Sequence, residues 1–310
     1  MPRLLYLFFL LPISLLATDA FQFAIGMGYR RDEAGMKFSA ERQELYTEKD
    51  LLNGIELDLF LKFPIQMVQI TIEGDVGWFV SGSGRNSATL QPPSLNAYQG
   101  TFNQSAAGFY ADAMANLGYA LGQQGLQVVP QVGFGTFYQQ IKHGTNHPQL
   151  DSTAGVASLA YTLCQTRIKR FWFGPSVGGD LLFRPHSAWI FSLGYFYYFL
   201  HFDQRFDPFA NLTYASPVSS QYFIWQKFRA STSAYGQRFA GKVSAQIAAD
   251  WRLNLLFNAY LFSARGKSIS SKQNFQQVFP EESFFSVVQR LSCNAWWQAY
   301  ATLLEVEYFF

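Results

Sequence analysis

The chain has 310 residues, of which 49% are hydrophobic and 18% are aromatic, but only 14% are charged. A soluble domain usually carries roughly 25% charged residues, so the composition argues against a soluble globular protein. The net charge is +2 and no stretch is strongly basic, so nucleic acid is not an expected partner. After the N-terminal segment, no apolar run reaches the roughly 18 residues that a membrane helix needs. Such a chain can cross a bilayer only as a β-barrel, in which backbone groups pair between strands.

Residues 1–20 have the features of a secretory signal peptide. Arg3 gives the positive charge at the start, Leu4 to Leu16 form an apolar core, and Ala17 or Ala20 offers a small residue for cleavage. The alternative is an uncleaved membrane anchor, but the apolar run is short for a membrane span. We therefore expect the chain to be exported and this segment to be removed.

Alternation of apolar and polar residues with a period of two begins directly after this segment. From Phe21 to Tyr29 the odd positions are mostly apolar or aromatic, and the even positions are small or polar. Ile55 to Phe63 and Val68 to Val80 repeat the pattern, with their charged residues on the face opposite the apolar one. In a membrane barrel the apolar face contacts lipid and the polar face lines the lumen, which explains why so few charges suffice.

Further segments with this character complete a predicted set of ten strands. They are Phe109–Leu121, Leu126–Tyr138, Arg170–Phe183, Ala188–Phe202, Arg238–Ala249, Arg252–Ser263 and Trp296–Phe310. The predicted fold is an all-β, closed antiparallel transmembrane β-barrel in the outer membrane, formed by residues 21–310 with both termini on the periplasmic side. A twelve-strand barrel, with Thr153–Thr162 and Tyr222–Phe228 as additional strands, is the alternative.

Short turns between the predicted strands alternate with long polar connections. The long connections are predicted at residues 31–52, 81–104, 141–168, 203–235 and 265–292. Outer-membrane barrels combine short periplasmic turns with long outer loops in this way.

The C-terminal segment carries an apolar face and ends on an aromatic residue, Phe310. This end resembles the terminal-strand signature that the barrel-assembly machinery recognises in outer-membrane proteins. The resemblance implies that Val306, Tyr308 and Phe310 act as an assembly signal, with the assembly machinery and outer-membrane lipid as partners.

The polar faces of the predicted strands supply a set of charged residues that would point into the lumen. They are Glu56, Asp58, Lys62, Glu73, Asp75, Asp112, Asp180, Arg238, Lys242, Arg252, Glu305 and Glu307. In a narrow ten-strand barrel these side chains would nearly fill the interior and pair with one another. In a twelve-strand barrel they would line an aqueous pore.

The order and spacing of several segments resemble the omptins, the ten-stranded outer-membrane proteases. A strand ending in Gly77-Trp78 is followed by the glycine- and serine-rich run Ser81 to Arg85. A strand, tight turn and strand then extend from Ala111 to Gln139, and Lys169 to Phe171 opens a later strand. A further strand enters the segment Asp203 to Pro208. In length and composition the chain also resembles the small porins of chlamydia-like bacteria.

The omptin resemblance implies a protease site in which a pair of acids faces an aspartate-histidine pair and water is activated between them. A histidine beside a carboxylate is suited to act as a general base near neutral pH. In this chain Asp203 matches the aspartate, but Arg205 occupies the histidine position, and Leu90 and Pro92 occupy the positions of the acid pair. The protease site is therefore predicted to be missing, and His201 and Asp203 are the remaining catalytic candidates.

Other site motifs are not predicted. His143 and His147 lie in a segment with glycine, asparagine and proline, where no helix would place them on one face, so we predict no metal site. No phosphate-binding glycine loop is found, and we predict no cofactor. Cys164 and Cys293 are the two cysteines, and the sequence leaves open whether they pair in an oxidising periplasm or remain structural thiols.

We therefore expect a non-enzymatic outer-membrane barrel that either passes small solutes like a porin or presents its surface to ligands. The alternatives are an omptin-type protease with a degenerate or rearranged site and an adhesin that acts through its long outer loops.

Overall fold

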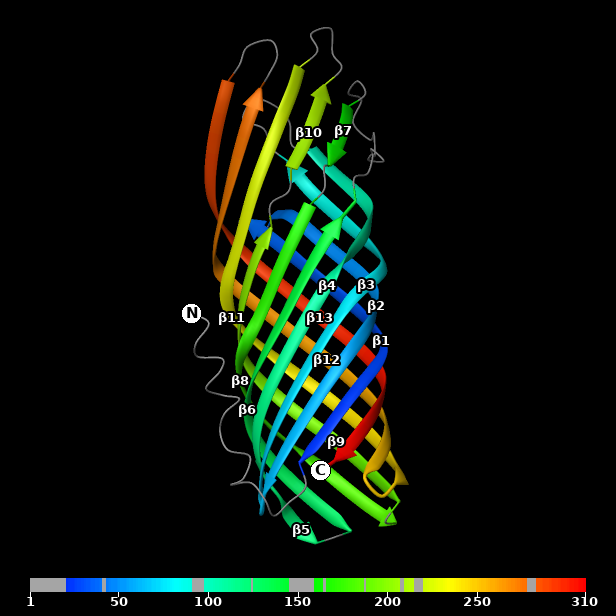
Figure 1. Cartoon of the computed structure of the whole chain (residues 1–310). Coiled ribbons are helices and arrows are strands. Elements are labelled where there is room, and N and C mark those ends of the chain that lie inside the picture. The colour runs from blue at the N-terminus through cyan, green and yellow to red at the C-terminus, as the bar shows by residue number, and fades with distance from the viewer. Residues whose placement is uncertain are drawn as a thin grey trace, which may run out of the picture.

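The computed structural model describes residues 21–40, 43–90, 98–123, 125–144, 159–163, 166–186, 188–206, 209–214, 220–277 and 283–310. These residues form a tall barrel of tilted strands (Figure 1). The strands are β1 Gln22–Ala40, β2 Gln43–Ile65, β3 Val68–Leu90, β4 Tyr98–Tyr119, β5 Leu121–Gln123, β6 Leu126–His143, β7 Leu159–Leu163, β8 Thr166–His186, β9 Trp189–Phe206, β10 Phe209–Tyr214, β11 Ser220–Ala248, β12 Trp251–Gln277 and β13 Ser283–Phe309. In this part of the chain we find no helix that is both long and apolar enough to cross a membrane.

Ten of these strands form a closed antiparallel ring. Their order is β12, β13, β1, β2, β3, β4, β6, β8, β9 and β11, and the pairing of β11 with β12 closes it. β1 pairs with β13 from Gln22 opposite Phe309 to Ser39 opposite Ser292, so the two ends of the chain are joined along most of β1. The short strands lie off the ring: β5 pairs with β6, and β10 pairs with β11 and β7. The predicted ten-stranded closed barrel is confirmed.

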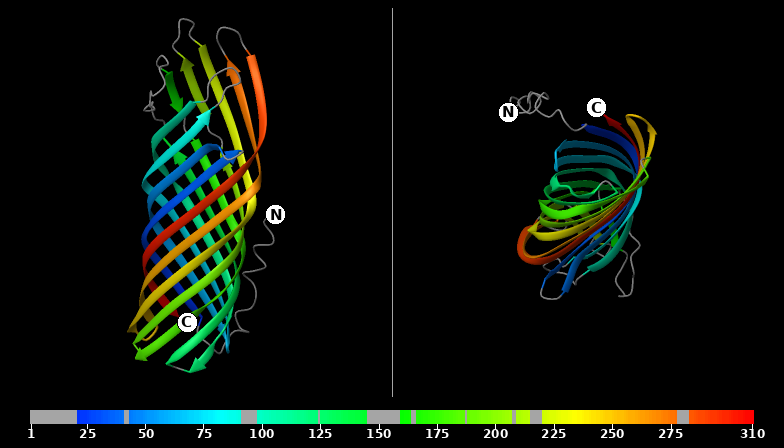
Figure 2. Two further views of the ribbon diagram at one scale, coloured as in Figure 1. Left: turned by 180° about the vertical axis from the view of Figure 1, so that it is seen from behind. Right: turned by 90° about the horizontal axis from the view of Figure 1, so that it is seen from below.

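The two ends of the barrel differ. Tight turns join β2 to β3, β8 to β9 and β11 to β12 at the end where the chain begins and finishes its sheet (Figures 1 and 2). In the turn between β2 and β3, Gln66 has φ 57°, the left-handed conformation that two-residue hairpin turns favour. Because outer-membrane barrels have their short turns in the periplasm, we call this the periplasmic end.

The strands reach further from the periplasmic end than the sequence predicts. β1 continues to Ala40 and β2 begins at Gln43, so most of the predicted connection at residues 31–52 is strand. The predicted connections at 81–104, 203–235 and 265–292 are also largely strand, and the prediction of long loops there is wrong. Beyond the membrane a strand no longer needs an apolar face, so the alternation fades while the backbone pairing continues.

The twelve-strand alternative is also wrong. Tyr222–Phe228 is part of β11, which already belongs to the ring. The described part of Thr153–Thr162 lies in β7, which pairs with β10 outside the ring. Both segments have strand character because they extend or flank existing strands, and neither adds a strand to the barrel.

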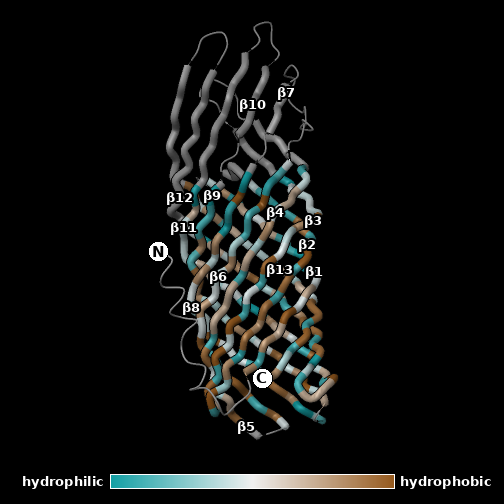
Figure 3. Tube along the Cα trace, viewed as in Figure 1, coloured by the Kyte–Doolittle hydropathy of each residue, from teal (hydrophilic) through white to brown (hydrophobic). Residues whose placement is uncertain are grey.

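Hydrophobic residues are frequent in the strands towards the periplasmic end (Figure 3), and those with exposed side chains form an apolar band on the outer wall. On β1, for example, Ile25, Met27 and Tyr29 are exposed on this wall, whereas Ala24 is buried inside. Val306 and Phe310, two residues of the predicted assembly signal, are exposed on the same wall. This apolar band is the surface that the lipid covers, as expected for an outer-membrane barrel.

Two predictions concern residues that the structure does not describe. The predicted signal peptide, residues 1–20, lies outside the described residues, and so does Cys164. Cys293 is a buried free thiol on β13.

Candidate functional site

An aromatic plug fills the middle of the lumen. We use this name for the buried side chains Phe137, Trp172, Tyr198, Phe202, Tyr260, Phe262 and Trp297. The Phe137 ring on β6 lies 4.7 Å from that of Phe262 on β12 and 5.9 Å from that of Trp297 on β13, measured between centroids. Trp172 on β8 packs against Phe202 at 4.2 Å. β6 and β13 lie opposite each other in the ring, so contacts between their side chains bridge the lumen.

Arg30, a buried arginine on β1, belongs to an ion-pair network that connects the plug to β1, β2 and β4. The Arg30 guanidinium donates to Asp32 at 2.8 Å, to Asp112 at 2.7 Å and to Glu56 at 3.2 Å, and all these side chains are buried. Its Cζ also lies 3.8 Å from the centroid of the Tyr110 ring. The Trp297 indole donates to Asp32 at 2.9 Å and thereby joins this network to the plug. Hydrogen-bonded ion pairs of this kind offset the cost of burying charge.

A second charged network lies further from the periplasmic end. Arg170 on β8 donates to Glu48 at 2.5 Å and to Asp50 at 3.4 Å, both on β2. The Nε2 atom of His143, at the end of β6, lies 2.7 Å from an oxygen of Asp50. All four side chains are buried inside the barrel.

The same residues have the donor atoms of a metal site. One ligand atom each of Glu48, Asp50 and His143 lies within 4.8 Å of the others, and carboxylates and imidazole are common ligands of transition metals. However, Arg170 contacts both carboxylates and supplies the positive charge that a metal ion would bring. His147, the predicted neighbour of His143, lies outside the described residues. The arrangement therefore works as an ion-pair network.

Sequence reasoning missed both networks for one reason. It ended the first strand at Tyr29 and treated residues 31–52 as a loop, which removed Asp32, Glu48 and Asp50 from the lumen. The signal was nevertheless present, because Arg30 and Asp32 continue the inward-facing even positions of β1. Strand parity carried beyond the apolar band would have placed both residues inside.

The catalytic candidates lie on the outer wall. His201 contacts the ring of Phe173 at 5.2 Å, and its Nε2 lies 2.9 Å from the hydroxyl of Ser231. An oxygen of Asp203 lies 3.9 Å from Nε of Arg229. Neither side chain faces the lumen, because the inward positions of this part of β9 belong to Phe202 and Gln204.

The other positions of an omptin-type site also lack its groups. Arg205 is exposed on the outer wall of β9, and Leu90 is the last residue of β3. Pro92 lies outside the described residues. The described residues therefore do not bring a catalytic histidine and acids together at the omptin positions.

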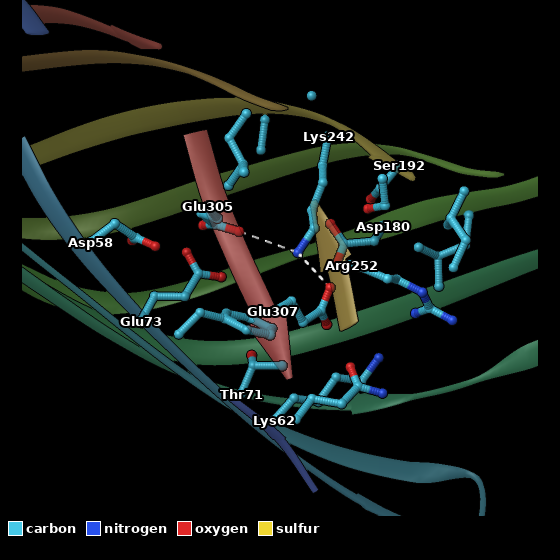
Figure 4. Close-up of a pocket in the computed structure, with 18 of the residues that line it drawn as sticks. Asp58, Lys62, Thr71, Glu73, Asp180, Ser192, Lys242, Arg252, Glu305 and Glu307 are labelled. Carbon is cyan, nitrogen blue, oxygen red and sulfur yellow. Dashed lines mark hydrogen bonds and ion pairs between the residues drawn. The ribbon is translucent and has the colours of Figure 1, made fainter. Parts of the chain in front are cut away.

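A vestibule lies between the plug and the periplasmic end. We use this name for a polar cavity of ≈ 140 Å³. Nine of the residues predicted to face the lumen line it, namely Asp58, Lys62, Glu73, Asp180, Arg238, Lys242, Arg252, Glu305 and Glu307. Arg238 pairs with Glu73 at 2.6 Å, and Lys242 lies 3.5 Å from Glu305 and 3.6 Å from Glu307 (Figure 4). The other three, Glu56, Asp75 and Asp112, are buried deeper in the barrel.

The outer wall carries a basic girdle beyond the apolar band. We give this name to the exposed residues Arg31, Lys49, Arg85, Lys142, Arg167, Lys169, Arg205, Arg229 and Arg265. They come from eight different strands of the ring: β1, β2, β3, β6, β8, β9, β11 and β12. Two acids lie among them, with Glu33 2.8 Å from Lys49 and Asp203 3.9 Å from Arg229. Basic residues at this level have the charge that anionic lipid headgroups attract.

Solved structures with a similar fold are outer-membrane barrels. The outer membrane protease OmpT from Escherichia coli superposes with a TM-score of 0.66 at 9% sequence identity, covering 95% of this chain and 98% of that one. The translocator domain of the autotransporter NalP from Neisseria meningitidis gives a TM-score of 0.34 at 8% identity, covering 96% and 91%. The match to OmpT indicates a shared fold, as the omptin resemblance implied. The TM-score with NalP is too low to show the same fold.

The sequence itself matches one family. No curated protein has a significantly similar sequence. The model of the family described as "Pom: Protochlamydia outer membrane protein" matches residues 24–310, which is the whole barrel. This match and the fold together confirm the predicted location in the outer membrane. The chain therefore belongs to the Protochlamydia outer membrane protein family.

Proposed function

We propose that the protein is a non-conducting barrel that presents a tall extension of its sheet at the cell surface, and that it acts there as a structural or contact protein. The observation that carries the proposal is the aromatic plug. Phe137 reaches from β6 to Trp297 on the opposite strand, and the Arg30 network fills the space beside them. We infer that packing of this kind blocks a continuous aqueous path through the barrel.

Liposome swelling tests the closed lumen. We expect the refolded wild-type protein to give no swelling with small sugars or salts. The double variant Phe137→Ala, Trp297→Ala removes two large rings from the plug and should give measurable swelling. The matched control is Phe134→Ala, Tyr300→Ala, which removes two exposed aromatic rings from the same strands. Swelling by the wild type that depends on solute size would replace our proposal with a porin.

The lengths of three strands favour presentation at the surface. β11 has 29 residues, and β12 and β13 have 27 each. A strand needs only about 9–11 residues to cross the hydrocarbon core. More than half of each strand therefore extends beyond it, and the upper end of the sheet provides the contact surface of an adhesin-like protein.

Cysteine labelling on intact cells tests this orientation. In a background without the native cysteines, Arg229→Cys in the basic girdle should react with a membrane-impermeant maleimide. Asp250→Cys, in the turn between β11 and β12, should react only after the cells are opened. The reverse pattern would show that the barrel is inserted the other way and would refute the proposal.

A protease function has no support in the lumen. His143 and Asp50 form a histidine-acid pair, but both side chains are fully buried and enclosed by Arg170 and Glu48. Cleavage of a peptide with paired basic residues, abolished by His201→Ala or Asp203→Ala, would contradict this part of the proposal.

A further inference from the structure

Three cations surround the periplasmic mouth of the vestibule. Lys62 on β2, Arg184 on β8 and Arg252 on β12 line the cavity near the periplasmic ends of their strands. None of the three forms an ion pair with a described residue. Deeper in the same cavity, by contrast, Arg238 and Lys242 are both paired.

The three mouth cations act on one another. Arg184 interacts electrostatically with both Lys62 and Arg252, so it stands between two like charges. Charges of equal sign repel more strongly near a low-dielectric wall than in open water. An anion at the mouth would be attracted by all three cations and would weaken the repulsion between them.

The acids near the mouth are already engaged. Asp180 and Glu307 act on Lys62, and Glu307 also acts on Arg252. However, Asp180 accepts a hydrogen bond from Gln131 at 2.5 Å, and Glu307 accepts one from Asn254 at 3.0 Å. Glu307 also neighbours Lys242, so its charge is shared among Lys62, Arg252 and Lys242.

The inner part of the cavity contains polar atoms without a partner. The hydroxyl oxygen of Thr71 and Oδ2 of Asp58 are buried, make no hydrogen bond to a described residue, and belong to side chains that line the vestibule. Both side chains are only 7% exposed. A buried polar group without a hydrogen bond is costly, so these atoms indicate a place where a bound molecule supplies the missing partners.

From these observations we propose that the vestibule binds a small organic oxyanion that enters from the periplasm. The carboxylate or phosphate group of the ligand lies between Lys62, Arg184 and Arg252, where two guanidinium groups can each donate a pair of hydrogen bonds. Hydroxyl or amino groups of the ligand extend inward to Thr71 and Asp58. The cavity of ≈ 140 Å³ has the volume of about five water molecules, so the ligand is a small metabolite-sized molecule.

Calorimetry on the full chain, folded in zwitterionic detergent, tests the site with two probes. Inorganic phosphate should bind saturably at low salt, and glycerol 3-phosphate should bind more tightly because its hydroxyl groups reach Thr71 and Asp58. Each of the variants Lys62→Gln, Arg184→Gln and Arg252→Gln should weaken phosphate binding about fivefold, or about 1 kcal/mol. The triple variant should not bind detectably.

Two further variants make the result specific. Arg205→Gln removes an exposed cation from the outer wall and should leave phosphate binding unchanged. Thr71→Val should abolish the higher affinity for glycerol 3-phosphate relative to phosphate. Heat-dependent mobility on a gel verifies that each variant is folded. Absence of saturable binding by the wild type, or equal binding by the triple variant, would overturn the proposal. Equal affinity for the two probes would overturn the assignment of Thr71 and Asp58.

The test is independent of the closed lumen. If the plug conducted solutes, the mouth cations would still bind phosphate. If the lumen is closed and phosphate does not bind, only the vestibule inference fails.

Discussion

Replacing Arg30 by methionine should destabilise the barrel strongly. Arg30 contacts three buried carboxylates, at 2.8 Å in Asp32, 2.7 Å in Asp112 and 3.2 Å in Glu56. Removing one member of a buried ion pair typically costs about 3–5 kcal/mol, because the other charge remains buried without a partner. We therefore expect Arg30→Met to lower the free energy of unfolding by about 3–5 kcal/mol.

Urea unfolding in detergent, followed by tryptophan fluorescence, measures this loss. Trp297 is a local reporter because its indole donates to Asp32. Arg205→Met, on the outer wall, is the matched control and should leave the unfolding midpoint nearly unchanged. Adding Asp32→Asn and Asp112→Asn to Arg30→Met should recover much of the loss, since the stranded charges are then removed. A loss below about 1 kcal/mol for Arg30→Met would show that the network does not hold the barrel together.

Three further predictions concern other parts of the chain. Deleting Phe310 should slow folding into lipid in the presence of the assembly machinery but should change the stability of the folded barrel little. Pulse-chase assembly assays measure the folding rate. An unchanged rate would contradict the predicted assembly signal. His143→Phe should lower the free energy of unfolding by about 1–3 kcal/mol because it leaves Asp50 without one of its hydrogen bonds, and denaturant titration measures the change. The double variant Arg167→Gln, Lys169→Gln should weaken the association of the girdle with anionic lipid by about 1 kcal/mol per charge. The salt dependence of lipid retention measures this change. An effect that does not depend on salt would contradict an electrostatic role.

The membrane-spanning part of the fold could be predicted because lipid and lumen impose opposite demands on neighbouring residues. In β1, Ile25 and Met27 are exposed on the outer wall, and Gly26 and Gly28, which alternate with them, allow a close approach of β13. The backbone oxygen of Thr302 would lie only 2.2 Å from a Cβ at position 28. These constraints produce the alternation of apolar residues with small or polar ones in the sequence. The strands near the periplasmic end could therefore be identified.

The upper half of the barrel could not be predicted on the same basis. Lys49 on the outer wall and Glu48 inside are both charged, so the alternation of apolar and polar residues disappears while the strand continues. The direction of the two weak catalytic candidates could not be predicted for a related reason. With β9 extended to Phe206, the parity of the strand puts His201 and Asp203 outside, whereas a loop would have left their direction open.

No local sequence pattern could predict which side chains pair inside the barrel. Arg170 and Glu48 are 122 positions apart, and the Trp297 indole reaches Asp32 across 265 positions. Such contacts follow from the order of strands around the ring and from the tilt of each strand, which fix the height at which two side chains meet. The twelve predicted lumen residues could be named in advance, but their partners could not.

The distribution of charge links the two proposals for this protein. In the body of the barrel, the buried cations Arg30, Arg170 and Arg238 all contact carboxylates from other strands. Cations without an ion-pair partner among the described residues lie at two levels, namely the mouth of the vestibule and the basic girdle, where Lys49 and Arg229 are the two paired members. Burying or crowding charge without compensation is costly, so a stable protein with unpaired cations at defined levels draws the compensating anions from its surroundings. We expect lipid headgroups to supply these anions at the girdle and, as proposed above, a periplasmic oxyanion to supply them at the mouth. The cations deep in the barrel are therefore compensated by carboxylates of the chain itself, whereas the cations at its two ends are open to anions from outside.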